Sequence, residues 1–364
     1  MVMNKICFIS YVDMRDAKSG SRVRPNEMLQ SFKEKGFDVL ELTGEQTAPD
    51  RRKKVDTLLN RIESERPEFC YIESPTYPIM KHCDRKLIKT LHKKGIKIGY
   101  FYRDFYRKFP QFRKKGFVRA IKDIILDFLQ WRTDSVLKYC DIVYFPSNES
   151  KELFNFHDMR VLPPAGNNYL PKREKAFNYT CIYVGGILGH YDGKLLLDSF
   201  NELVKRDHRF KLILVCRVEE WNIFEHPLKQ EKWLEIHHTS GKGLAELYNR
   251  ALIALIPLVS QNENIYNKYA IPVKTFEYIS YGLPIVSVCV QALKRLIEEE
   301  RIGIVVDSTP SAIADGIQRM TSSKKTYEEY CKKVKNALLN RNLWSHRVET
   351  VKNDLTSVEN TYAR

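Results

Sequence analysis

The sequence lacks the long apolar runs and the paired cysteines that would place it in several common protein classes. No hydrophobic stretch approaches the ~18 residues of a membrane-spanning helix, and no secretory signal precedes the first apolar run at residues 5–10. The eight cysteines are scattered singly, without a CxxC pair. This usage disfavours a zinc site or a disulfide framework, and it predicts reduced, buried cysteines in a cytoplasmic protein.

Internal repeats, low-complexity tracts and coiled-coil heptads are also missing, which excludes solenoid and fibrous architectures. What remains is an ordinary globular composition of 364 residues, 43% hydrophobic and 29% charged. A chain of this length is expected to form two domains, each with its own core.

Short apolar runs alternate with amphipathic stretches along the chain. Strands are predicted at residues 5–10, 37–42, 69–73, 96–102 and 141–145, with helices between them, including 25–35, 51–65, 81–94 and about 116–139. After a stretch rich in proline and asparagine at 161–171, strands are predicted again at 179–184, 211–216, 233–237, 251–256, 285–288 and 303–306, before a helical tail at about 326–362. Strands that alternate with helices indicate doubly wound parallel sheets, so the sequence predicts α/β domains at 1–165 and 166–344.

The stretch 271–288 combines several signals of a ligand site. A loop limited by proline leads into a short helix, which Gly282 ends with Pro284 just beyond it. Lys274 and Glu277 are three residues apart, so they share one face near the helix N-terminus. A lysine at that place favours an anion, and a carboxylate can accept two hydrogen bonds from a diol. This pair suits a nucleotide, although an ordinary surface ion pair has the same spacing.

The full string KTFEYISYGLPIV, starting at Lys274, resembles the donor-binding segment of GT-B-fold glycosyltransferases, in particular the large retaining group 1 family that uses nucleotide-sugars. The resemblance implies two facing Rossmann-like domains with a cleft between them and a last helix, about 345–364, that packs back onto the first domain. It also implies that Glu277 holds the donor ribose, that a UDP- or GDP-sugar is the co-substrate, and that no cofactor is bound permanently.

Two positions depart from the family pattern. Family members carry an arginine after the strand and glycine that match 179–185, where this chain has Gly186. They also carry a glutamate eight residues before the ribose-binding one, where this chain has Tyr269. The residues Gly185 and Gly186 would let a phosphate approach the helix that begins near residue 192. Further predicted donor-site or catalytic residues in this domain are Lys194, Arg217 and His190.

In the first domain, predicted site residues follow strands one and four. The resemblance places a loop with Gly20 and Arg22 against donor and acceptor. Asp104, which follows an apolar strand, is a candidate for orienting or deprotonating an acceptor hydroxyl, with Arg103 paired to it or to phosphate. A structural ion pair is the other interpretation of these two residues. No metal site is predicted.

The first domain also carries most of the net charge of +15: residues 1–165 hold 32 Lys and Arg against 22 Asp and Glu, and the rest of the chain 28 against 23. Residues 103–122 contain eight Lys and Arg, one acid and several phenylalanines. This segment suits an anionic membrane surface or single-stranded nucleic acid. Because no nucleic-acid-binding motif is present, the membrane is favoured over nucleic acid. A solvated loop and helix face is the other interpretation of this segment. The predicted membrane-binding residues are Arg113, Lys114, Lys115 and Arg119.

Together these features predict a peripheral membrane glycosyltransferase at the inner face of the membrane. It would transfer a sugar from a nucleotide-sugar to a hydroxyl of a saccharide or lipid-linked acceptor, without a metal ion, in cell-surface polysaccharide or glycan synthesis. The alternatives are a nucleotide-sugar epimerase of the same fold and a nucleotide-binding scaffold that has lost catalysis, which the two departures from the family pattern would suit.

Overall fold

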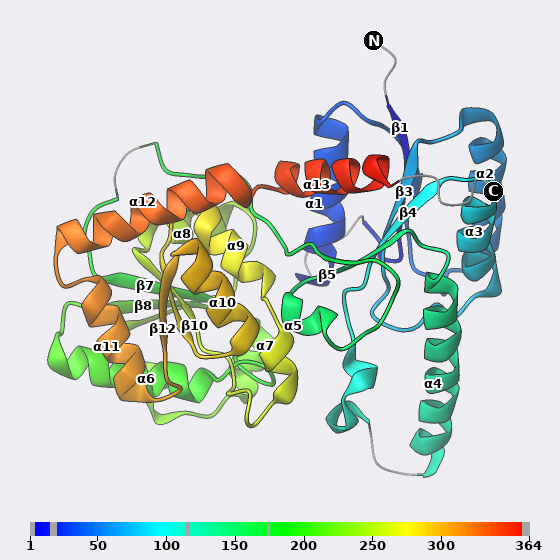
Figure 1. Cartoon of the computed structure of the whole chain (residues 1–364). Helices are drawn as coiled ribbons and strands as arrows, with labels where there is room; N and C mark the ends of the chain where they lie inside the picture. Colours follow the sequence, from blue (N-terminus) through cyan, green and yellow to red (C-terminus); the bar gives the residue numbers. More distant parts are fainter. Residues whose placement is uncertain (1–3, 15–19, 114–116, 173–174, 359–364) are drawn as a thin grey trace. The chain divides into compact units, whose positions relative to one another are not determined.

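The computed structural model describes residues 4–14, 20–113, 117–172 and 175–358. The chain divides into two compact units, one formed by 1–163 together with 344–364 and the other by 164–343. Each unit is a parallel β-sheet with helices against it (Figure 1). Five of the eight cysteines lie in strands or next to them and are buried, as predicted, whereas Cys289 is exposed and Cys83 and Cys331 are only partly buried.

The first unit holds a six-stranded sheet in the order β2-β1-β3-β4-β5-β6, in which all pairs are parallel. Its strands are β1 (Lys5–Ser10), β2 (Asp38–Leu42), β3 (Phe69–Glu73), β4 (Lys97–Phe101), β5 (Ile142–Phe145) and β6 (Met159–Val161). Its helical elements are α1 (Gly20–Glu34), α2 (Arg51–Glu65), α3 (His82–Lys93), η1 (Tyr106–Lys108), η2 (Pro110–Phe112), α4 (Phe117–Leu137), α5 (Asn148–Lys151) and α13 (Trp344–Ser357).

The second unit holds a six-stranded parallel sheet in the order β12-β11-β10-β7-β8-β9. Its strands are β7 (Thr180–Val184), β8 (Lys211–Val215), β9 (Leu234–His237), β10 (Ile253–Ile256), β11 (Ile285–Val288) and β12 (Gly303–Val306). Its helical elements are α6 (Gly193–Arg206), α7 (Val218–Ile223), η3 (Pro227–Gln230), α8 (Lys242–Arg250), η4 (Ile265–Tyr269), α9 (Val273–Ser280), α10 (Gln291–Glu300), α11 (Pro310–Met320) and α12 (Lys324–Arg341).

The inner strands of both sheets are almost wholly apolar. Helices cover both faces of each sheet, so a polar side chain on either face of an inner strand would be buried. Ile182, Ile213 and Ile285, for example, lie on three different strands of the second sheet and are fully buried. Burying each such side chain stabilises the fold by about 1.5–3 kcal/mol. This apolar character is what made nearly all strands recognisable in the sequence.

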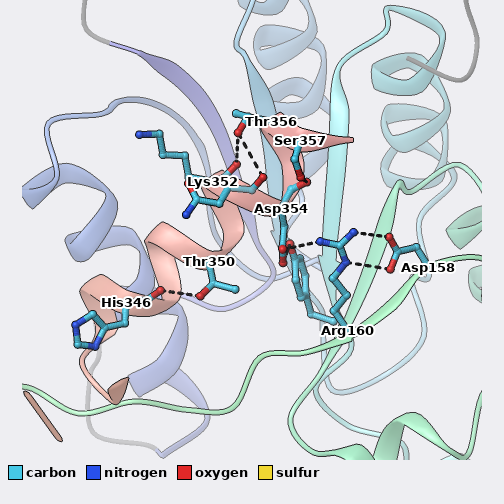
Figure 2. A network of polar contacts seen from close by, with 10 residues as sticks. Asp158, Arg160, His346, Thr350, Lys352, Asp354, Thr356 and Ser357 are labelled. Atoms are coloured by element: carbon cyan, nitrogen blue, oxygen red, sulfur yellow. Dashed lines mark hydrogen bonds and ion pairs between the residues drawn. The ribbon is translucent and has the colours of Figure 1, made fainter. Parts of the chain in front are cut away.

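The last helix, α13, belongs to the first unit although it is separated from it in sequence by the whole second unit. Its buried face carries Val348, Val351 and Leu355. A Cβ atom on Gly99 of β4 would lie 3.1 Å from Leu355 Cδ1, so the absence of a side chain there lets the helix approach the sheet. Figure 2 shows the polar edge of this contact, where the Arg160 guanidinium bridges Asp158 and Asp354.

Three local expectations differ from the structure. The helix α1 begins at Gly20, not at Pro25, so the predicted loop around Gly20 and Arg22 is the first turn of a helix. A sixth strand, β6, was not predicted, because its sequence Met-Arg-Val is short and only half-buried. The helical tail is two helices separated at Asn342 and Leu343, where Gly166 N donates to Asn342 O.

Candidate functional site

The strand order of the second sheet reverses between β7 and β10, and ligands of such sheets bind beyond the carboxyl ends of the strands at that point. The strand β7 ends at Val184 and is followed directly by Gly185. The segments that follow β7 and β10 meet through a bridge between Tyr191 and Leu258 and a hydrogen bond from Val259 N to His190 O. This edge of the second unit is therefore the candidate site.

Lys274, on the first turn of α9, lies against the glycine that ends β7. Its Nζ donates to the Tyr183 hydroxyl at 3.1 Å and lies 3.7 Å from the ring centroid of Tyr191 and 4.3 Å from that of Tyr183. A Cβ atom built on Gly185 would collide with Lys274 Nζ, and the φ of Gly185 is +134°. A positive φ of this size favours glycine, and a side chain here would also displace the Lys274 ammonium, so Gly185 and Lys274 form one feature.

Lys274 is expected to change its charge close to neutral pH. Burial lowers the pKa of this ammonium from 10.5 to about 7, and the nearby Glu277 and Glu220 carboxylates oppose that shift only partly. The two tyrosine faces stabilise the charged form through their ring quadrupoles. An anion that enters the site would supply the missing negative partner, so Lys274 is suited to bind a phosphate.

Glu277 lies one turn further along α9 and is half-buried among tyrosines. Burial raises the pKa of the Tyr248 hydroxyl, and the neighbouring Glu277 carboxylate adds to the shift. The Tyr248 ring stacks on Tyr281 at 4.7 Å, and Tyr281 lies 5.3 Å from the half-exposed ring of Tyr169. A carboxylate beside an aromatic row can accept hydrogen bonds from a sugar while the rings offer flat apolar faces.

The backbone N–H groups after Gly186 and at the start of α6, which the sequence predicted to bind phosphate, largely donate to acceptors of the protein itself. Glu220 Oε2 accepts from Ile187 N at 2.8 Å, and a Cβ atom on Gly186 would lie 3.2 Å from the same oxygen. Asp192 caps α6 by accepting from Leu195 N at 2.9 Å. Lys274, rather than the N-terminus of α6, is therefore the anion partner that the geometry offers.

The other predicted residues of this unit have different surroundings. Arg217 is 72% exposed and pairs with Glu220 at 3.4 Å, while Lys194 is exposed on α6. His190 Nδ1 lies 3.2 Å from Asn267 Oδ1. Because the amide nitrogen of Asn267 donates to two backbone carbonyls, at 2.7 and 3.2 Å, its oxygen is oriented toward the histidine ring. Tyr269, at the position of the family's glutamate, is the last residue of η4.

In the first unit, Arg103 and Asp104 follow β4 and form an ion pair, with Arg103 Nε 3.0 Å from Asp104 Oδ2. Both side chains are mostly buried, at 13% and 16% exposed. Arg103 is held further by Ser74 Oγ, which accepts from its backbone N, and by Thr76 Oγ1, which accepts from Nη2 at 2.7 Å. The pair is thus fixed at the carboxyl edge of the first sheet, where a ligand is expected.

The basic segment of the first unit is less cationic in the structure than in the sequence. Arg107 pairs with Asp123 at 2.6 Å and with Asp127 at 2.5 Å, and Arg113 pairs with Asp127 at 3.2 Å. Both acids lie on α4, just beyond residue 122, where the basic segment ends. Lys114 and Lys115 lie outside the described residues, as does the side chain of Arg119.

Sequence reasoning missed Tyr183, Tyr191, Glu220 and Tyr248 as site residues. They come from elements up to 91 positions away from Lys274 and carry no local motif. Only the tyrosines at the end of β7 and just after it gave a signal, an aromatic pair flanking the glycine turn.

The comparisons with known proteins concern the fold and the family of the second unit. Residues 178–323, less than half of the chain, match the sequence model of the family described as glycosyl transferases group 1. Solved structures match nearly the whole chain, among them WaaG, a glycosyltransferase involved in lipopolysaccharide biosynthesis, with a TM-score of 0.61, 13% identity and coverage of 97% of this chain and 100% of that one. The chain has the GT-B fold.

Two further solved structures that match the chain contain UDP. An α-glucosyltransferase in complex with UDP and a 13-mer DNA has a TM-score of 0.62 at 12% identity, with 97% of this chain and 100% of that one covered. The MnaA–UDP structure from S. aureus has a TM-score of 0.52 at 10% identity, with 97% and 96% covered. No curated protein matches the sequence. Lys274, Glu277 and Gly185 all lie inside the group 1 segment.

The described residues contain neither a membrane-spanning helix nor a cluster of side chains suited to a metal ion. None of their helices is long and apolar enough to cross a membrane. Within the same ranges, no group of three or more His, Cys, Asp or Glu side chains is placed to hold a metal ion.

Proposed function

We propose that the chain is a glycosyltransferase that moves a sugar from a nucleotide-sugar to a hydroxyl of a saccharide or lipid-linked acceptor, in cell-surface polysaccharide or glycan synthesis. The observation that carries the proposal is the half-buried Lys274 ammonium against Gly185, one turn before Glu277, inside the segment that matches group 1. In this assignment Lys274 binds the donor phosphates and Glu277 the ribose hydroxyls.

The chemistry asks the site to stabilise the negative charge that grows on the departing nucleoside diphosphate. The Lys274 ammonium supplies the positive charge that does this. Arg217, close to the glycine turn, and His190, on the same edge of the sheet, are further hydrogen-bond donors. Asp104, with Arg103, orients or deprotonates the acceptor hydroxyl from the first unit. The family resemblance favours retention of the anomeric configuration, and the chain's own cations take the place of a metal ion.

A thermal screen tests the donor assignment. UDP, GDP, ADP and CMP are each added to the purified protein, and the melting temperature is measured. We expect one of the diphosphates to stabilise the protein, by about 2.7 kcal/mol at 100 times its dissociation constant. The corresponding nucleotide-sugar should then release that diphosphate only when a hydroxyl acceptor is present. Absence of stabilisation by every nucleotide would contradict the proposal.

One alternative keeps a specific observation in its favour. Gly186 and Tyr269 stand where the family has a phosphate-binding arginine and a sugar-contacting glutamate. A nucleotide-binding scaffold without catalysis would show the thermal shift but no release of the diphosphate with any acceptor. An epimerase would convert the donor to its epimer without an acceptor and without net release of the diphosphate, so analysis of the remaining nucleotide-sugar separates it from the scaffold.

We also propose that the enzyme acts at the inner face of an anionic membrane. Residues 103–122 of the first unit carry the basic and aromatic residues that support this placement, and a lipid-linked acceptor would be met there.

A further inference from the structure

The helix α4 exposes a stripe of large apolar side chains on its outer face. Five residues with helical spacing make up this apolar stripe: Ile121, Ile124, Ile125, Phe128 and Trp131. Ile124 is 68% exposed and Trp131 64%. Ten positions separate the first from the last, which corresponds to about 15 Å of helix. A continuous exposed stripe of this kind marks an interaction surface rather than ordinary scattered apolar exposure.

A basic pocket adjoins the stripe where α4 passes α3. The cavity has a volume of about 210 Å³, and Lys and Arg side chains make up half of its lining: Arg85, Lys86, Lys89, Arg132 and Lys138. Trp131 belongs both to the apolar stripe and to this lining, and the Arg132 guanidinium lies 5.8 Å from the ring centroid of Phe128. The pocket and the stripe are therefore one surface.

The cations that line this pocket have an acid near them, Asp84, whose carboxylate pairs with Arg51 at 2.9 Å and only partly opposes the lowered pKa of Arg85. No carboxylate is among the residues that line it in the described part of the chain. Burial lowers the pKa of the Arg85 guanidinium, and the neighbouring Arg132 cation lowers it further. Arg85 is 94% buried by side chains around it, its Nη1 donates to Met80 O at 3.0 Å, and its Nε has no hydrogen-bond partner among the described residues. A site with this excess of positive charge favours an anion with several acceptor oxygens.

We propose that this surface docks on an anionic phospholipid bilayer, with the apolar stripe of α4 in the interface and a lipid phosphate in the basic pocket. The charge complementarity with an anionic headgroup selects this occupant over a second copy of the chain, whose own copy of the surface carries the same charge. Amphipathic helices with aromatic residues on one side and Lys or Arg around them bind bilayer surfaces in this way. The inference rests on the membrane placement proposed above and moves the contact from residues 103–115, whose arginines are partly neutralised, to α3 and α4.

Vesicle cosedimentation tests the docking surface. The full chain is mixed with vesicles of phosphatidylcholine alone, or of phosphatidylcholine with phosphatidylglycerol. We expect binding to the anionic vesicles only, weakened but not abolished by high salt, because salt screens the lysines and not the apolar contact. Inorganic phosphate at high concentration should compete weakly. If no vesicles bind and calorimetry shows that inorganic phosphate binds to the protein, the pocket serves a soluble phosphate compound, and the proposal is overturned.

Two variants separate the two parts of the surface. Lys86→Ser/Lys89→Ser should weaken vesicle binding roughly 30-fold, since each basic residue near the surface contributes about fivefold. Ile124→Ser/Phe128→Ser should weaken it at least ~10-fold and make the remainder strongly salt-dependent. The matched controls are Lys53→Ser/Lys205→Ser, which removes the same charge from exposed positions of α2 and α6, and Ile223→Ser, which removes an exposed apolar residue of α7. Both controls should bind as the wild type does.

All variants should keep their melting temperature and their response to the nucleotide, because the substituted side chains are exposed and distant in sequence from the donor segment. This readout distinguishes a failure of the docking surface from a failure of the proposed function. Equal binding of all four variants, or a dimer that forms through the apolar stripe and does not bind vesicles, would overturn the inference.

Discussion

Replacing Asp104 by Asn is expected to lower turnover by about 10²–10⁴-fold while leaving nucleotide affinity unchanged, if its carboxylate acts on the acceptor. The residue follows β4 at the carboxyl edge of the first sheet, whereas Lys274 and Glu277 belong to the second unit. Asparagine keeps the shape of the side chain but cannot take a proton from a hydroxyl. The measurement is the rate of diphosphate release with a saturating acceptor, together with the dissociation constant of the diphosphate.

Because Asp104 forms an ion pair with Arg103, the alternative is that Asp104 only stabilises the fold. If the pair only stabilises the fold, Asp104→Asn should lower the melting temperature and change the rate little. Asp158→Asn is the matched control, because Asp158 also pairs with an arginine of the first unit, at 2.8 Å, but precedes β6 at the opposite edge of the sheet. The control should retain full activity. Similar rates for the two variants would assign Asp104 a structural role.

Nucleoside diphosphate binding is expected to take up close to one proton above pH 7. Burial holds the pKa of Lys274 at about 7 in the free protein, so the side chain is mostly neutral at pH 8.5. A bound diphosphate favours the ammonium form and raises that pKa. Affinity should therefore fall as pH rises, by about tenfold per pH unit between pH 7.5 and 9, where the ligand's phosphates are already ionised.

Calorimetry in buffers of different ionisation enthalpy measures this proton uptake directly. Lys274→Met is the control variant, because it removes the titrating group from the site. It should bind the diphosphate weakly, with an affinity that no longer changes over this pH range, and should bind the nucleoside as the wild type does. Proton uptake that persists in Lys274→Met would assign the titration to another group, such as Lys175, whose pKa burial also lowers to about 7.

The donor segment shows how much of a site local sequence can reveal. The helix over Lys274 and Glu277, its end at Gly282 and the following strand are all present nearly as predicted, because glycine, proline and an apolar run are strong local signals. The side chains that surround Lys274, by contrast, could not be predicted from the local sequence. Its tyrosines and Glu220 come from β7, the loop after it and α7, so their contact depends on the strand order of the sheet.

The exposure of the apolar face of α4 is a feature that the sequence could not show. Its apolar residues follow helical spacing, which in a sequence indicates a face turned to the core. In the structure, the same spacing lies on the exposed side, and Asp123 and Asp127 neutralise the arginines that precede the helix. Periodicity predicts that one face of a helix is apolar, but only the packing of its neighbours decides whether that face is covered.

The central claim is that Glu277 binds the ribose of a donor nucleotide whose phosphates lie on Lys274. The most direct measurement is calorimetry of wild type and Glu277→Gln with the diphosphate selected by the thermal screen and with its 2′,3′-dideoxy analogue. Loss of the charge-assisted hydrogen bonds, worth about 1.5–3 kcal/mol, should weaken ribonucleotide binding roughly 10- to 150-fold in the variant. The variant should then distinguish the two ligands little, whereas the wild type distinguishes them strongly. Wild-type affinity in Glu277→Gln, or an equal loss on removing the diol from both proteins, would contradict the account.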